Sequence, residues 1–146
     1  MRVLIESPFG RNVDGSQCTP AQYARNTVYV RRALADSLSR GEAPFASHAI
    51  YPLVLDDSDA DARRRGMEAG FSWGDKAEAV VVYGDYGKTS GMCEGIARWR
   101  KQGTPIEFRL IGKNNAPTSR GFCEHGIKFE GCALCLHAAL VVAQGL

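Results

Sequence analysis

An unbroken apolar run, Ala79–Tyr83, limits the possible folds of this chain more than any other feature. The run ends at Gly84, and its length is that of a β-strand. Because no polar residue alternates with the apolar ones, we expect both faces of the strand to be buried. Such strands are typical of parallel sheets that carry helices on both sides, so the run favours an α/β fold.

Three further strands are predicted from short apolar or alternating segments, at residues 2–6, 43–55 and 105–111, the second together with its exit loop. In the last segment, Ile106, Phe108 and Leu110 point one way. Glu107 and Arg109 point the other way, so one face of this strand is expected to be wet, as at a sheet edge. Right-handed crossovers leave few topologies, and we predict a small flavodoxin-like sheet of four parallel strands in the order 2-1-3-4.

Helices are predicted between the strands from caps, glycines and the spacing of apolar residues. The first begins at Thr19 and Pro20, because the threonine can cap it and the proline needs no amide partner there. Its core-facing stripe is expected at positions three or four apart: Tyr23, Thr27, Val30, Leu34 and Leu38. Ser58 is expected to begin the second helix and Ser90 to cap the third, which ends at Gly103.

The composition excludes several classes of protein. With 18 Lys and Arg against 16 Asp and Glu, the net charge of +2 is too small to indicate a nucleic acid or an anionic membrane as partner. No apolar run approaches the roughly 20 residues that span a bilayer. An acid follows only three apolar residues at the start of the sequence, which is too short for a secretory signal. We therefore expect a cytoplasmic protein.

The predicted topology locates a ligand site. In an open parallel sheet, ligands bind beyond the carboxyl ends of the strands where the strand order reverses, here between segments 2–6 and 79–83. The loops at this point supply the candidate ligand-binding residues, which are Ser7, Pro8, Phe9, Gly10, Gly84, Ser90, Gly91 and Met92. The second loop leads into a helix whose free amides can hold a phosphate. The alternative is that its glycines only turn the chain.

Two acids near this crevice offer catalytic chemistry. Asp85 follows the buried strand, and Glu94 lies on the first turn of the third helix. One acid can attack the anomeric carbon of a sugar while another group protonates the leaving base. Alternatively, Glu94 is a solvated carboxylate stabilised by the helix dipole. His48 can bind a ribose hydroxyl or phosphate or tie down a loop, and Arg11 and Asn12 can contact a phosphate or lie in a solvated loop.

Several stretches carry a resemblance to a known family: Ser7-Pro8-Phe9, Ala24-Arg25-Asn26, 40–48, Leu55-Asp56-Asp57, Gly70-Phe71, Trp73-Gly74, Val81-Val82-Tyr83, Ser90-Gly91-Met92 and 103–109. Over about residues 1–111 the chain resembles an uncharacterised phage and bacterial family related to nucleoside 2-deoxyribosyltransferases. The resemblance implies a nucleoside or nucleotide in the crevice, N-glycosidic bond cleavage or transfer through a glutamate on the third helix, and homo-oligomers. It also makes Ser90 the candidate for holding a 5′-phosphate. The protein is then expected to be cytosolic or phage-encoded.

The sequence departs from that pattern at the nucleophile. Relatives with Gly-Met carry two residues and then Glu, and counting from Gly91-Met92 puts that position at Gly95. Glu94 is one residue earlier, which is about 100° around a helix. With Glu94 as nucleophile and Asp85 as the assisting acid, we predict an N-glycosidic hydrolase or transferase. The rival prediction is a module that binds a nucleotide without cleaving it.

The tail carries a metal-ligand pattern. Cys123, His125, Cys132 and Cys135 have the spacing C-x-H-x6-C-x2-C, which suits one tetrahedral structural zinc ion. The alternatives are free or disulfide-forming thiols, and His137 is a spare ligand if His125 points away.

We therefore predict a nucleotide-binding domain at 1–111, a linker at 112–121, and a zinc-binding tail at 122–146 that ends in a short apolar helix. That helix needs a surface to cover. The tail is thus a third candidate function, as an interaction element for a protein partner or a second copy of the chain.

Overall fold

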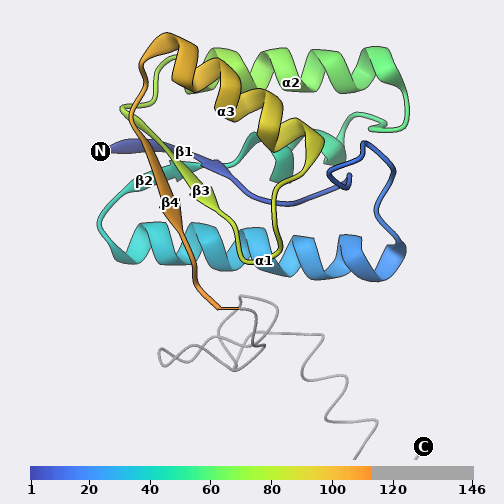
Figure 1. The fold of residues 1–146 in the computed structure, drawn as a ribbon, viewed down its shortest axis with the longest axis horizontal. Coiled ribbons are helices and arrows are strands. Elements are labelled where there is room, and N and C mark those ends of the chain that lie inside the picture. The colour runs from blue at the N-terminus through green and yellow to red at the C-terminus, as the bar shows by residue number, and fades with distance from the viewer. Residues whose placement is uncertain (113–146) are drawn as a thin grey trace, which may run out of the picture. The chain divides into compact units, whose positions relative to one another are not determined.

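The computed structural model describes residues 1–112, which form a three-layer α/β domain (Figure 1). Its four parallel strands are β1 (Arg2–Glu6), β2 (Ala43–Phe45), β3 (Ala79–Tyr83) and β4 (Ile106–Arg109). Its helices are α1 (Pro20–Ser39), α2 (Ala60–Gly74) and α3 (Ser90–Gln102). The strand order is β2-β1-β3-β4, with α1 on one face of the sheet and α2 and α3 on the other. The predicted fold class and strand order are confirmed.

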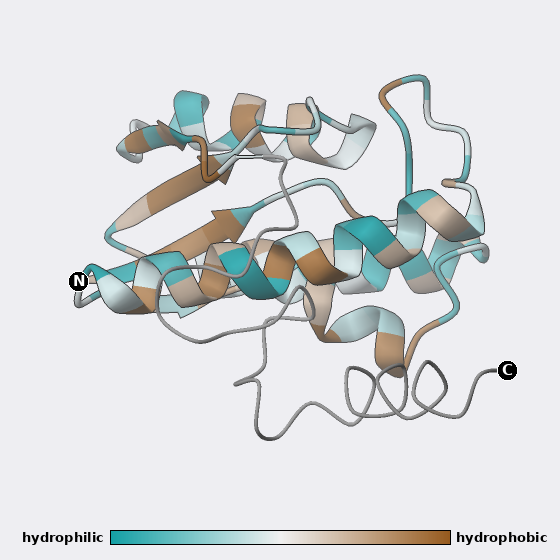
Figure 2. Cartoon of the chain, turned by 90° about the horizontal axis from the view of Figure 1, so that it is seen from below, coloured by the Kyte–Doolittle hydropathy of each residue, from teal (hydrophilic) through white to brown (hydrophobic). Residues whose placement is uncertain are grey.

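The two central strands are the most apolar elements of the domain (Figure 2). Every side chain of β3 is buried, as its composition predicts. Side chains of β1 alternate between the two layers: Val3 and Ile5 join the core under α1, and Leu4 joins the core under α2 and α3. Glu6 has the same parity as Leu4, so it points toward the layer of α2 and α3.

Trp99 is the largest fully buried side chain, and it fills the core between the sheet, α2 and α3. Gly74 at the end of α2 makes room for it, because a Cβ there would lie 2.2 Å from Cη2 of the indole. Phe71 packs edge-on against the indole with ring centroids 5.7 Å apart. The indole N–H is thereby fixed at the sheet side of α3.

The predicted stripe on α1 is wrong at its ends. Tyr23 and Leu38 are 40% and 61% exposed, whereas the buried positions are Asn26, Tyr29, Val30, Ala33 and Ser37. Two polar residues take core positions because each has a partner there. The amide of Asn26 donates to the carbonyl oxygen of Phe9 at 2.7 Å, and the Ser37 hydroxyl donates to Glu42 at 2.7 Å. Burial of satisfied polar groups therefore shifts the core face away from the one predicted from apolar spacing.

The helix ends differ from the prediction by one residue in two places. Asp59 caps α2 in place of Ser58, and Thr89 caps α3 in place of Ser90. Each cap has an extended backbone, and its side-chain oxygen accepts a hydrogen bond from an amide of the first turn. The predicted start of α1 at Thr19 and Pro20 is confirmed, and Gln22 completes a capping box there. The predicted end of α3 at Gly103 is also confirmed, with φ 74° at this glycine.

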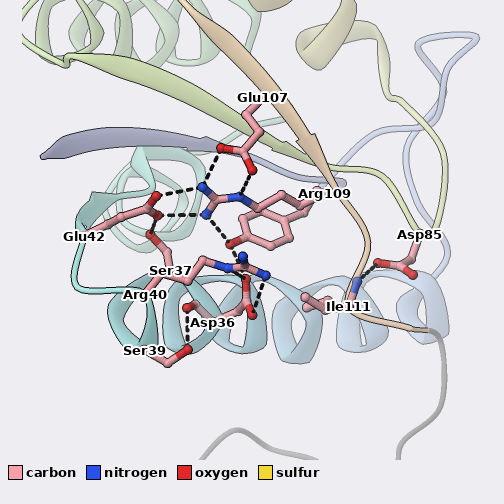
Figure 3. Close-up of polar contacts among 10 residues, drawn as sticks. Asp36, Ser37, Ser39, Arg40, Glu42, Asp85, Glu107, Arg109 and Ile111 are labelled. Carbon is pink, nitrogen blue, oxygen red and sulfur yellow. Dashed lines mark hydrogen bonds and ion pairs between the residues drawn. The ribbon is translucent and has the colours of Figure 1, made fainter.

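β4 lies at the edge of the sheet, as predicted, but its burial follows the predicted alternation only in part. Ile106 packs against the core under α2 and α3 and Glu107 is exposed, whereas Phe108 is 53% exposed and Arg109 only 8% exposed. Arg109 is buried because its guanidinium forms ion pairs with Glu42 and Glu107, both at 2.7 Å (Figure 3). A charge partner distant in sequence, rather than alternation, therefore determines the burial of Arg109.

Residues 113–146 lie outside the described residues. The prediction of a zinc site at Cys123, His125, Cys132 and Cys135, the spare ligand His137, and nearly all of the predicted linker fall in that range. Within residues 1–112, no helix has the length and apolar character needed to cross a membrane.

Candidate functional site

A cavity of about 110 Å³ lies at the carboxyl end of β1 and is open to solvent on one side. Its walls come from the loop after β1, the 3₁₀ turns η1 (Ser47–Ala49) and η2 (Tyr51–Leu53), α2 and the first turn of α3. Gly70 of α2 lets η1 come close, because a Cβ on it would lie 2.5 Å from the Ser47 hydroxyl oxygen. The cavity lies where the strand order reverses, which is where a ligand is expected in such sheets.

Glu6, the last residue of β1, brings a carboxyl group to the wall of this cavity. Its Oε1 accepts a hydrogen bond of 3.4 Å from Nε1 of Trp99. Within residues 1–112, no cationic side chain forms an ion pair with it. Burial raises the pKa of Glu6 to about 7, although the Trp99 hydrogen bond acts in the opposite direction. About half of the Glu6 carboxyl groups therefore still carry a proton at pH 7.

Ser7 and His48 form a hydrogen-bonded pair next to Glu6. The Ser7 hydroxyl oxygen lies 2.8 Å from Nε2 of His48, and both side chains line the cavity. Burial lowers the pKa of His48 to about 4, so the imidazole is neutral at pH 7. The Phe9 ring stands edge-on to this imidazole with centroids 5.7 Å apart. His48 therefore ties η1 to the end of β1, as one of the two alternatives predicts, and it also lines the cavity. Its contact with a ribose hydroxyl or a phosphate stays a prediction.

Two arginines and one aspartate form the charged wall. Nη1 of Arg63 in α2 donates to both carboxylate oxygens of Asp57, at 2.8 and 2.9 Å. Arg11 donates from Nη2 to the Asp57 carbonyl oxygen at 2.9 Å, and its Nε is buried without a hydrogen-bond partner in the described part of the chain. Because two cations face one anion, this wall has a surplus positive charge.

The charged wall meets the beginning of α3. Nη2 of Arg63 approaches Gly91 so closely that a Cβ on the glycine would lie 3.2 Å from it. The Ser90 amide donates to the carbonyl oxygen of Asn12 at 3.2 Å, and the Met92 amide donates to Thr89 at 3.3 Å. A guanidinium and a helix N-terminus, both favourable to anions, thus lie side by side.

The two predicted catalytic acids do not line this cavity. Glu94 lies on the exposed side of α3, because the inward position belongs to Gly95, about 100° further around the helix. Asp85 accepts a hydrogen bond of 2.5 Å from the Tyr29 hydroxyl. It also accepts hydrogen bonds from the backbone amides of Ile111 at 2.8 Å (Figure 3) and Gly112 at 2.9 Å. Desolvation acts to raise the pKa of Asp85, but these hydrogen bonds outweigh it and lower the pKa. Asp85 therefore joins the ends of β3 and β4 to α1.

Most of the predicted ligand-binding residues do line the cavity: Ser7, Phe9, Gly10, His48, Gly91 and Met92. Outside its lining lie Pro8, Gly84 and Ser90. Glu6 and Arg63 also line the cavity, although neither was predicted from the sequence. An acid at the end of a predicted strand is a signal for Glu6, because strand ends face the crevice in such folds. Arg63 lies inside a helix with no motif around it, so its role depends on contacts distant in sequence.

Residues 1–109 match the model of a family described as Domain of unknown function (DUF7768). The chain belongs to this family. The matched range of the DUF7768 domain includes all four strands and every residue that lines the cavity. No curated protein and no solved structure matches the chain. Within the described part of the DUF7768 domain, no three His, Cys, Asp or Glu side chains group as a metal ion would require.

Proposed function

We propose that the DUF7768 domain binds a nucleoside or a nucleoside 5′-monophosphate in the cavity at the end of β1. The proposal is based on the lining of this cavity, which has three chemically different walls. A cationic wall meets a helix N-terminus, an apolar and aromatic wall lies along α2 and η2, and a group of neutral polar side chains ends β1. These walls suit a phosphate, a base and a sugar, respectively.

The phosphate subsite is supported by the geometry of Arg63. Its ion pair with Asp57 uses Nη1, while Nη2 lies beside Gly91, 3.2 Å from where a Cβ of that residue would be. A guanidinium can donate a second charge-assisted hydrogen bond from that nitrogen. An anion between Arg63 and the Gly91 amide would gain from both groups and from the helix dipole.

The base subsite is supported by the apolar lining. Phe9, Tyr51, Leu55, Met67 and Phe71 all line the cavity. Flat apolar surfaces of this kind favour an aromatic ring, as in most small-molecule sites. The enclosed 110 Å³ is smaller than the roughly 300–1,000 Å³ of most ligand pockets, so we expect one end of a nucleotide to lie at the open mouth.

The sugar subsite is supported by the polar groups at the end of β1. The neutral imidazole of His48, the Ser7 hydroxyl and the Glu6 carboxyl offer donors and acceptors suited to sugar hydroxyls. The resemblance of the sequence to a family related to nucleoside 2-deoxyribosyltransferases favours the same ligand class. The roles first expected for Glu94 and Asp85 are not part of this proposal.

Isothermal titration calorimetry on the full chain tests the proposal, with nucleosides, their 5′-monophosphates and inorganic phosphate as ligands. We expect monophosphates to bind more tightly than nucleosides. Arg63→Gln should weaken monophosphate binding about 10- to 100-fold, the range for loss of a charge-assisted hydrogen bond, and leave nucleoside binding nearly unchanged.

The matched control is Arg64→Gln, because Arg64 is the next residue on α2, is 66% exposed and, within residues 1–112, pairs only with exposed Asp61. This variant should bind every ligand like the unaltered protein. Failure of all the nucleosides and monophosphates to bind the unaltered chain at millimolar concentration would refute the proposal.

A further inference from the structure

We propose that a second cavity of this domain binds a diphosphate group. The second cavity has a volume of about 430 Å³ and lies between the loop after β1, the second turn of α1 and the loop that joins β3 to α3. Figure 1 shows this last loop reaching α1. The cavity at the end of β1 is the first cavity, and the proposal does not require a ligand in it.

Three cationic side chains line the second cavity, and within residues 1–112 no carboxylate side chain does. Arg11 follows β1, Arg25 lies on α1, and Lys88 precedes α3. The first cavity, by contrast, has Glu6 and Asp57 in its lining. A cleft lined by charges of one sign concentrates ions of the opposite sign, so the second cavity favours an anion.

The positive charge of this lining is not compensated by the domain itself. Neither Arg25 nor Lys88 forms an ion pair within residues 1–112. Nε of Arg11 lies 3.8 Å from Asp57, but the same carboxylate also pairs with Arg63, so one anion faces two cations. A bound anion would supply the negative charge that these residues do not have.

Arg25 is held in position by side chains that leave its charge in place. Its Nε and Nη2 donate to Oδ1 of Asn26 at 3.2 and 3.0 Å, and its guanidinium lies 4.2 Å from the centroid of the Tyr86 ring. Both partners line the same cavity, and the Asn26 amide is itself fixed by the carbonyl oxygen of Phe9. Because this guanidinium is already ordered, it loses less conformational entropy when it binds an anion.

The loop before α3 brings Lys88 to the same space. Gly87 has a φ of 81°, a conformation that favours glycine, and Lys88 and Thr89 follow it directly before the helix. Glycine, lysine and a hydroxyl residue between a strand and a helix also occur in phosphate-binding loops, where the lysine reaches the second or third phosphate. Here two residues, rather than four, separate Gly84 from Gly87. Because the loop is shorter than that motif, we assign the binding mainly to the cationic side chains.

A diphosphate suits the second cavity better than a single phosphate. The volume of about 430 Å³ lies within the roughly 300–1,000 Å³ of most ligand pockets. Two phosphate groups carry more charge than one, and their oxygens can accept charge-assisted hydrogen bonds from donors on three separate segments. The source is free pyrophosphate or the phosphate chain of a nucleotide. A nucleotide could extend into the first cavity, because Arg11 and Thr89 line both.

Isothermal titration calorimetry of the full chain with pyrophosphate and with inorganic phosphate tests the proposal. We expect pyrophosphate to bind about tenfold more tightly than phosphate, the effect of one further charge-assisted contact. Arg25→Gln and Lys88→Gln should each weaken pyrophosphate binding about 10- to 100-fold, the range for a lost hydrogen bond to a charged group. Unchanged binding in both variants would overturn the proposal.

The matched controls are Arg31→Gln on α1 and Lys101→Gln on α3. Both residues are exposed, lie on the same elements or next to them, and line neither cavity. Each control removes one positive charge, as the test variants do, and should bind pyrophosphate like the unaltered chain. Equal weakening in controls and test variants would show a general attraction between charges instead of a site, and would overturn the proposal.

Arg63→Gln shows which cavity pyrophosphate uses, because Arg63 lines the first cavity and not the second. We expect this variant to bind pyrophosphate with a Kd close to that of the unaltered chain. Loss of binding in Arg63→Gln, with normal binding by Arg25→Gln and Lys88→Gln, would overturn the second cavity as the site. No binding of pyrophosphate or of any nucleoside 5′-diphosphate at millimolar concentration would also overturn it.

Nucleoside 5′-diphosphates distinguish the two sources of the diphosphate group. If one nucleotide spans both cavities, which rests on the proposed function, it should bind more tightly than pyrophosphate and be weakened by Arg63→Gln and Lys88→Gln alike. If the second cavity takes free pyrophosphate, Lys88→Gln alone should weaken binding of either ligand. Both results support the second cavity. Binding of pyrophosphate without binding of any nucleoside or monophosphate would refute the proposed function and leave this inference intact.

Discussion

Two groups of ionisable side chains in this domain differ in whether their charges are paired. In the Arg109 cluster (Glu42, Tyr83, Glu107 and Arg109), Arg109 donates four hydrogen bonds of 2.7–2.8 Å to two carboxylates (Figure 3). These bonds lower the pKa of Glu42 to about 2 and raise that of Arg109. Every charge of the cluster is kept and satisfied within the domain.

At the cavity, two partly buried groups are shifted toward their neutral forms. Among the described residues, the Glu6 side chain has only an indole N–H as hydrogen-bond partner and His48 only a serine hydroxyl. The pKa of Glu6 is raised to about 7 and that of His48 is lowered to about 4, both by burial. Satisfied networks stabilise a fold, whereas ionisable groups buried with unused hydrogen-bonding capacity in a cavity are typical of a ligand site. The difference supports a structural role for the Arg109 cluster and the ligand site that we propose at the Glu6 cavity.

The largest expected effect is the loss of stability when the Arg109 cluster is broken. Arg109→Met leaves Glu42 buried beside Ser37 without its cation, and should lower the free energy of unfolding by about 3–5 kcal/mol. Chemical denaturation at pH 7 measures this change. The control is Arg98→Met, whose ion pair with Asp75 is 38% and 40% exposed on its two sides and should contribute less than about 1 kcal/mol. If both variants lost the same free energy of unfolding, the cluster would have no special structural role.

The next effect is a change in the pH dependence of stability. The pKa of Glu6 is about 7 in the folded state against 4.5 when unperturbed, so between these values the folded protein binds the extra proton. Stability from Glu6 is therefore fully present below pH 4.5 and lost as the pH rises to 7. Relative to the unaltered protein, Glu6→Gln should gain on the order of 2–3 kcal/mol between pH 4 and pH 8.

His48 acts in the opposite direction over an overlapping range. Its pKa is about 4 in the folded state against 6.5 when unperturbed, so its contribution is present above pH 6.5 and lost as the pH falls to 4. The two groups partly cancel in the unaltered protein, which is why the difference between variants is the useful quantity. A stability difference between Glu6→Gln and unaltered protein that is the same at pH 4 and pH 8 would contradict the account.

The smallest effect tests the fit between Glu6 and α3. Gly95→Ala should destabilise the domain by about 1–3 kcal/mol, because the new methyl displaces the Glu6 carboxyl. In a Glu6→Ala background the same change should be neutral or stabilising by up to about 1 kcal/mol, since alanine favours a helix. A double-mutant cycle by chemical denaturation measures this coupling. Additive effects would mean that the two residues do not compete for one space.

The fold could be predicted because its signals are local. The composition of β3 shows that both of its faces are buried, Thr19 and Gln22 mark the start of α1, and crossover handedness then restricts the strand order. The location of the cavity follows from that order. The predictions of a zinc ion bound by the tail and of homo-oligomers stay predictions; metal analysis and sizing of the full chain would test them.

The chemistry of the site could not be predicted, because it depends on contacts between distant residues. Glu6 meets Trp99, which is 93 residues away, and Arg109 meets Glu42 across 67 residues. The resemblance put the relatives' acid position at Gly95, and the structure brings the carboxyl of Glu6 from β1 to that place. Alternation in β4 likewise could not reveal that an arginine has a buried carboxylate partner.

The central claim is that Glu6 is an unpaired carboxyl in a nucleotide cavity, and NMR can test it directly. In ¹³C-labelled protein, with the Glu6 resonance assigned by comparison with Glu6→Gln, the side-chain carboxyl shift is followed against pH with and without a nucleoside 5′-monophosphate. The account predicts a titration midpoint near 7 and a shift of this resonance on nucleotide addition. A midpoint at or below the unperturbed 4.5, together with no response to any nucleotide, would contradict it.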